Sequence, residues 1–119
     1  MSDSTNKIFS AKFQGQKALE QLQQNSENPI LVKFVAPHCS ACKTLAPVLE
    51  QLMTDYQGKI DLVTIDMTED PEFAIELSVR SAPTVVLFKG NTVLEKIAGL
   101  KPKKLYLEAI QKVLIPNPG

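Results

Sequence analysis

The sequence predicts an α/β domain in which a central mixed β-sheet is flanked by helices and closed by a hairpin and a C-terminal helix. Helix-like and strand-like segments alternate up to residue 79, an order typical of parallel strands joined by crossover helices. Two further strand-like runs then surround Gly90-Asn91, a dipeptide that favours a hairpin. Parallel crossovers followed by an antiparallel hairpin predict a mixed sheet.

The first half of the chain predicts two helices around one buried strand. Both helical segments carry apolar residues that recur every three or four positions. The strand "ILVKFVA" is a nearly continuous apolar run, as expected for a strand covered on both faces. Pro47 lies inside the second helix, and we expect it to kink that helix. The expected elements are a helix at 11–24, a loop at 25–29, a strand at 30–36 and a helix at 39–56.

The second half continues the alternation and ends in a helix. "KIDLVTID" is a second buried strand by its apolar run, and "TEDPEFAIELSV" has a proline and acidic residues where a helix begins. The segment "KPKKLYLEAIQKVL" has the periodicity of an amphipathic helix. The expected elements are a strand at 59–66, a helix at 68–79, a hairpin at 84–99 and a helix at 101–114.

Composition predicts one soluble domain over residues 1–119, with a flexible tail at 1–10. The chain is 44% hydrophobic and 22% charged, and its 13 basic residues balance 13 acidic ones. This balance argues against nucleic acid or an anionic membrane as a partner. The N-terminus lacks the apolar stretch of a secretory signal, and no run approaches the roughly 20 residues of a membrane helix. We therefore expect a cytoplasmic protein, and a monomer.

The only two cysteines, Cys39 and Cys42, stand in the segment "APHCSACK" with two residues between them. Such a pair can be a redox couple, part of a metal site, or two inert core residues. Cytosolic thiols are kept reduced, so a CxxC pair in that compartment is more often catalytic or metal-binding than a structural staple. Inert core cysteines would not favour this spacing.

The spacing suits thiol–disulfide exchange. Cys39 opens a helix, where unpaired N–H groups and a partial positive charge stabilise a thiolate relative to a thiol. The thiolate is the attacking species. Cys42 follows three residues later and faces the same side one turn deeper, so it can close a disulfide or attack a mixed disulfide held on Cys39.

A metal site is the first alternative. Cys39, Cys42 and His38 offer three ligands, fewer than the four of a structural zinc site, and the adjacent His38 and Cys39 point in different directions. Two chains sharing a cluster through their CxxC pairs would restore this possibility. We expect no bound metal.

The sequence resembles the thioredoxin family in "FVAPHCSACKTLAPVLEQL" and "VRSAPTVVLFKG". The family pattern includes the paired cysteines, the lysine and proline that follow them, a cis-proline with a small residue before and a threonine after it, and a glycine after the last strand. The matching positions here are Lys43, Pro47, Ala82, Pro83, Thr84 and Gly99. The resemblance spans about residues 15–114. Within the family, "YQGKIDLVTIDMTEDPE" and "GLKPKKLYLEAI" look most similar to the thioredoxin domain joined to some NADPH-dependent thioredoxin reductases.

The resemblance implies the thioredoxin fold and a protein-disulfide reductase. Cys39 would be the nucleophile and Cys42 the resolving thiol, with no cofactor beyond their redox-active disulfide. The chain has no dinucleotide fingerprint, so electrons would come from a thioredoxin reductase or a similar disulfide reductase and pass to disulfide-containing target proteins. The residues implied in substrate binding are Pro37, Ala82, Pro83, Ala98 and Gly99.

Three departures from the family pattern concern proton transfer and redox tuning. Ser40 and Ala41 replace the Gly-Pro of the most reducing members, and His38 replaces the tryptophan before the first cysteine. His38 is either a protonated neighbour that favours the Cys39 thiolate or an exposed loop residue. Lys33 stands where many members bury an aspartate; a desolvated lysine can serve as a base, whereas a strand lysine more often extends to the edge, here toward Asp61.

Two other functions stay open. An oxidant or isomerase would share the chemistry in the reverse direction, and a non-catalytic binding module would share only the fold. The basic segment "KPKK" at 101–104 either borders the docking groove and attracts an acidic partner or is a solvated helix start.

Overall fold

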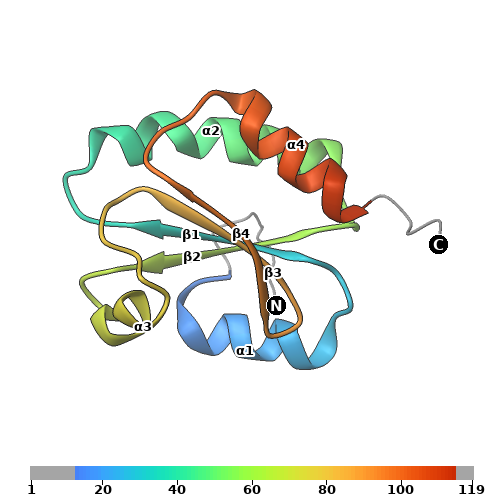
Figure 1. The fold of residues 1–119 in the computed structure, drawn as a ribbon, viewed down its shortest axis with the longest axis horizontal. Helices are drawn as coiled ribbons and strands as arrows, with labels where there is room; N and C mark the ends of the chain where they lie inside the picture. Colours follow the sequence, from blue (N-terminus) through green and yellow to red (C-terminus); the bar gives the residue numbers. More distant parts are fainter. Residues whose placement is uncertain (1–12, 115–119) are drawn as a thin grey trace, which may run out of the picture.

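The computed structural model describes residues 13–114, which form a four-stranded sheet between two pairs of helices. Figure 1 shows α2 and α4 on one face of the sheet and α1 and α3 on the other. The elements are α1 (Gly15–Asn25), β1 (Ile30–Val35), α2 (Ser40–Asp55), β2 (Asp61–Asp66), α3 (Pro71–Glu76), β3 (Thr84–Lys89), β4 (Thr92–Ala98) and α4 (Lys103–Leu114).

The strand order is β2-β1-β3-β4. β1 is parallel to β2 and antiparallel to β3, and β3 is antiparallel to β4, which confirms the mixed sheet and the hairpin. A β-bulge between Leu87 and Phe88 leaves Leu94 without a partner in β3. All eight expected helices and strands are present in the expected order.

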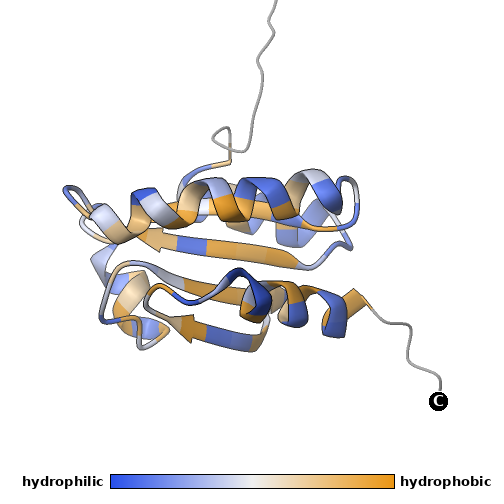
Figure 2. Cartoon of the chain, turned by 90° about the horizontal axis from the view of Figure 1, so that it is seen from above, coloured by the Kyte–Doolittle hydropathy of each residue, from blue (hydrophilic) through white to orange (hydrophobic). Residues whose placement is uncertain are grey.

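Two apolar clusters hold the layers together, one on each face of the sheet. Alternation along β1 sends Leu31 toward α2 and α4, and sends Val32 and Phe34 toward α1 and α3. Leu49 of α2 is fully buried in the first cluster and Leu19 of α1 in the second. Figure 2 shows hydrophobic residues along the strands and alternating hydrophobic and hydrophilic residues along the helices.

The expected helix at 11–24 begins later than predicted, at Gly15. Gln14 has extended backbone angles and bridges Thr64 in parallel, and the Thr64 N–H donates to the carbonyl of Phe13 at 3.0 Å. Residues 13 and 14 therefore run along the outer edge of β2, and Gly15 (φ +87°) turns the chain into α1. The expected tail at 1–10 lies outside the described residues.

The expected helix at 68–79 is shorter, Pro71–Glu76. Before it, the Asp66 carboxylate accepts hydrogen bonds from the Thr68 N–H (2.8 Å) and hydroxyl (2.6 Å), which form a turn and lower the pKa of Asp66. After it, Ser78 takes a left-handed conformation (φ +58°) that ends the helix. α2 runs without a break through Pro47, and the kink there stays a prediction.

None of the helices within residues 13–114 is long and apolar enough to cross a membrane.

We predict that Leu49→Ala lowers the free energy of unfolding by about 2–5 kcal/mol, because it leaves a cavity in a fully buried layer between α2 and the sheet. Urea titration followed by circular dichroism measures this loss. Leu94→Ala is the matched control: Leu94 is 46% exposed, and we expect a change within about 0.5 kcal/mol. Equal losses in the two variants would contradict the assignment of Leu49 to the core.

Candidate active site

The two cysteines form a disulfide at the first turn of α2. Their Cα atoms are 5.3 Å apart. Cys39 is the N-cap residue with extended backbone angles, and its Sγ accepts a hydrogen bond from the Cys42 N–H at 3.1 Å. A sulfur thus occupies the capping position that usually holds a serine or aspartate oxygen. When the disulfide is reduced, the same N–H is placed to stabilise a Cys39 thiolate.

The two sulfurs differ in exposure. Cys42 lies in the first turn of α2 and is 7% exposed, whereas Cys39 is only half-buried at the end of the loop that follows β1. Cys39 is therefore the more accessible of the two cysteines to an incoming disulfide.

A second segment approaches Cys39 from β3. The Ala82–Pro83 peptide bond is cis, as the family resemblance implied, and the carbonyl oxygen of Ala82 lies 3.6 Å from Cys39 Sγ. The Gly99 N–H donates to the Pro83 carbonyl at 2.8 Å, and Ala98 pairs with Thr84. The structure thus gathers Ala82, Pro83, Ala98 and Gly99 beside the disulfide.

Pro37 is exposed on the loop just before Cys39. Its role in substrate binding, like that of the four residues beside the disulfide, stays a prediction.

Sequence reasoning missed Tyr106, which positions this region. Tyr106 is fully buried in α4, its hydroxyl donates to the Gly99 carbonyl at 3.2 Å, and it accepts from the Lys101 N–H at 3.1 Å. The loop that carries Gly99 is therefore fixed to α4. The available signal was a tyrosine on the apolar face of an amphipathic helix, because a buried hydroxyl requires a partner.

Lys33 is buried in the middle of β1, with 9% of its surface exposed. It lies on the face of the sheet that α2 and α4 cover, because it alternates with Val32 and shares the side of Leu31. Burial lowers the pKa of the Lys33 ammonium from its ordinary value of 10.5, and the negative charge of Glu50 on α2 raises it by less.

The expected approach of Lys33 to Asp61 is wrong. Asp61 points to the opposite face of the sheet and accepts a hydrogen bond from the Ser26 hydroxyl at 3.0 Å, so Glu50 is the carboxylate that acts on Lys33.

The three residues that flank the cysteines, His38, Ser40 and Ala41, are exposed or half-buried. His38 is exposed and adopts a left-handed backbone (φ +58°), a conformation that histidine tolerates better than most residues and that turns the chain toward Cys39. Ser40 is exposed, and its carbonyl accepts from the Thr44 hydroxyl at 3.2 Å. Ala41 is half-buried. The tuning roles of these three residues stay predictions.

Within residues 13–114, no three side chains of histidine, cysteine, aspartate or glutamate gather as a metal site would require.

We predict that Lys33→Met raises the free energy of unfolding near neutral pH. The pKa of Lys33 is lowered in the folded chain. Between this lowered value and the ordinary value of 10.5, the unfolded chain binds more protons than the folded chain, so the free energy of unfolding rises with pH. The gain from Lys33→Met should therefore be largest near neutral pH and shrink toward pH 10. Urea titrations at several pH values measure it, with the exposed Lys59→Met as the matched control. A gain that does not change with pH would contradict the lowered pKa.

Comparison with known proteins gives one consistent result. A family model described as Thioredoxin matches residues 10–112. The chain is 42% identical over 84 residues to a thioredoxin of Staphylococcus aureus, a match that covers 71% of this chain and 81% of that protein. It is 41% identical over 91 residues to the chloroplastic M-type thioredoxin of Spinacia oleracea, covering 76% of this chain and half the length of that protein.

A solved structure agrees with the sequence comparison. A mutant thioredoxin from Halobacterium salinarum superimposes with a TM-score of 0.78 at 29% identity, over 89% of this chain and 91% of that one. Its likeness extends to the sheet and flanking helices that place the disulfide. The chain therefore belongs to the thioredoxin family of dithiol–disulfide oxidoreductases.

Proposed function

We propose that the chain reduces disulfides of target proteins, with Cys39 as the attacking and Cys42 as the resolving sulfur. The observation that carries this proposal is the pairing of a half-buried Cys39 with a buried Cys42. The Cys42 N–H donates a hydrogen bond to Cys39 Sγ at 3.1 Å. The difference in exposure gives the two sulfurs their order of reaction.

The reaction begins with the reduced dithiol. The Cys39 thiolate attacks one sulfur of a target disulfide, the target S–S bond breaks, and the second target sulfur leaves as a thiolate that takes up a proton. Cys42 then loses its proton and attacks Cys39 Sγ. This step releases the first target sulfur as a thiol and forms the Cys39–Cys42 disulfide, so two electrons have moved to the target.

A disulfide reductase then supplies two electrons that reduce the Cys39–Cys42 disulfide to the dithiol. We propose a thioredoxin reductase or a similar enzyme in this role, a cytoplasmic location, and a monomeric working form without nucleic acid or membrane partners. The balanced charge of the chain supports the absence of nucleic acid and membrane partners, and the family membership supports a disulfide reductase as the electron donor.

We predict opposite outcomes for the two single-cysteine variants. Cys39→Ser should abolish insulin reduction in the presence of dithiothreitol, because it removes the attacking sulfur. Cys42→Ser should still attack but not resolve, so a mixed disulfide between the chain and its target accumulates and is seen by mass spectrometry under non-reducing conditions. A Cys39→Ser variant with full activity, or a mixed disulfide that accumulates on Cys42 of Cys39→Ser but not on Cys39 of Cys42→Ser, would refute the assigned order.

We also propose that neutral Lys33 accepts the proton of Cys42 during resolution. Lys33 lies on the sheet face beneath α2, the helix that buries Cys42, and burial lowers the pKa of Lys33. The charged group that acts on Lys33 is Glu50 of α2. The side chain at the aligned position of β2 is Thr64 and that of β3 is Val85, neither of which is charged.

We predict that Lys33→Met slows resolution by roughly 10²-fold near neutral pH, as expected when a general base is lost. The rate of this variant should still rise with pH, because the Cys42 thiolate is the attacking species, whereas the rate of the unmodified chain should also rise as Lys33 loses its proton. Glu50→Gln should shift this rise to lower pH, because Glu50 raises the pKa of Lys33. Stopped-flow measurement of mixed-disulfide decay between about pH 6 and pH 9 tests both. Lys59→Met is the exposed control. Decay rates of Lys33→Met equal to those of the unmodified chain across this range would refute the base role.

A further inference from the structure

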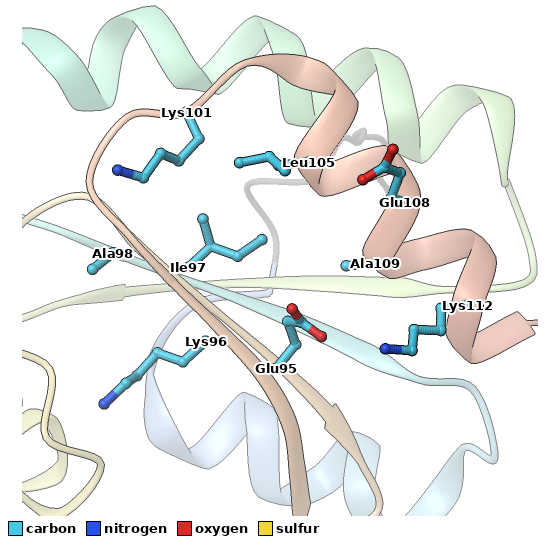
Figure 3. A pocket seen from close by; sticks show the side chains of 9 residues that line it. All are labelled: Glu95, Lys96, Ile97, Ala98, Lys101, Leu105, Glu108, Ala109 and Lys112. Carbon is cyan, nitrogen blue, oxygen red and sulfur yellow. The ribbon is translucent and has the colours of Figure 1, made fainter.

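A groove of about 390 Å³ lies between the outer edge of β4 and α4 (Figure 3). Its apolar lining consists of Ile97 and Ala98 on β4 with Leu105 and Ala109 on α4. Leu105 is 41% exposed, which is high for a leucine on a packed helix. Lys101 lies toward the Ala98 end of the groove, and Glu95 and Lys112 lie toward the other end.

The wall formed by β4 is an open strand edge. β4 ends the strand order, and within residues 13–114 no strand pairs with its outer side. Hydrogen-bonded and non-hydrogen-bonded pairs alternate along an antiparallel ladder. Because the Gly99 N–H donates to Pro83, the alternation turns the N–H and C=O groups of Ala98 and Lys96 away from β3. These groups are available to an added strand.

The side chains of the groove suit such a strand. Figure 3 shows Ile97 and Leu105 projecting between β4 and α4 from opposite walls. In an extended segment every second side chain points the same way, so a segment paired with β4 sends one side chain between these two residues. Lys96 does not obstruct it, because its ammonium group is directed to the other face, where it donates to the carbonyls of Leu77 and Ser78 at 3.2 Å.

The groove is continuous with the redox site. Ala98, at one end of the groove, pairs with Thr84, which directly follows Pro83, and the Ala82 carbonyl is 3.6 Å from Cys39 Sγ. The Lys101 ammonium lies beside Gly99, 4.0 Å from where a Cβ atom on that glycine would stand. A polypeptide joined to Cys39 therefore leaves the sulfur next to the entrance of this groove.

We propose that the groove binds the extended segment of the target protein that flanks the cysteine joined to Cys39, as a strand added to β4. The segment places an apolar side chain between Ile97 and Leu105 and an acidic side chain near Lys101. This proposal rests on the proposed disulfide reduction and adds the determinant by which protein targets are distinguished from small disulfides.

The test compares a protein disulfide with a small one. Leu105→Asp should lower kcat/KM for insulin by about tenfold, mainly through KM, and leave the rate with the small disulfide DTNB unchanged. Leu94→Asp is the matched control, because Leu94 is 46% exposed on the same hairpin and does not line the groove. Leu94→Asp should behave like the unmodified chain with both substrates.

A second measurement leaves the groove intact. In the mixed disulfide between Cys42→Ser and a cysteine peptide with an apolar and an acidic residue, amide hydrogen exchange of Lys96 and Ala98 should be slower than in the free variant. Unchanged exchange, or insulin kinetics of Leu105→Asp equal to those of Leu94→Asp, would overturn the proposal. The proposal would also be overturned if the unmodified chain formed a dimer through β4 and no target peptide bound in the groove. Failure of the unmodified chain to reduce both insulin and DTNB would instead refute the proposed function.

Discussion

Burial of β1 on both faces is the constraint from which the geometry of the redox site follows. β1 lies between β2 and β3, and five of its six residues are buried, so its register is set by apolar contacts on each side. The strand ends at Val35, and the short loop after it delivers Cys39 to the start of α2. β3 is paired with the same strand, which brings the Ala82–Pro83 segment to the same end of the sheet. Cys39 and the Ala82–Pro83 segment meet because both depend on β1: Cys39 follows β1 along the chain, and Ala82–Pro83 leads into β3, which pairs with β1.

The same burial explains why Lys33 is unusual. A charged group in this layer costs free energy that an apolar residue would not, and Glu50 only partly offsets the cost. The sequence shows a lysine inside an apolar run but not whether its ammonium reaches solvent, since a flexible stem allows either outcome. In the structure only 9% of the surface of Lys33 is exposed, and burial beneath α2 lowers its pKa. The position of a buried lysine beneath the helix that carries both cysteines is the observation behind the base role proposed above.

Features of the fold that depend on residues close together in the sequence could be predicted, whereas contacts between distant segments could not. Apolar runs such as "ILVKFV" and the Gly90-Asn91 turn carry their own signal, so each strand was placed to within a few residues. The cysteine spacing likewise located the centre of the site. The bond of Tyr106 to Gly99, the pairing of Phe13 with Thr64 and the groove beside β4 join segments that are distant along the chain. Periodicity within one element contains no information about them.

The backbone bridge at Thr64 has a consequence for self-association. Strand pairing between copies of a protein can continue without limit only if each copy has two edge strands with unpaired backbone groups. Among the described residues, the far border of β2 is already occupied at its middle by Phe13 and Gln14, which leaves only the border at β4. Accidental strand pairing between two copies is therefore favoured at β4, where the pairing of two identical edges closes as a dimer.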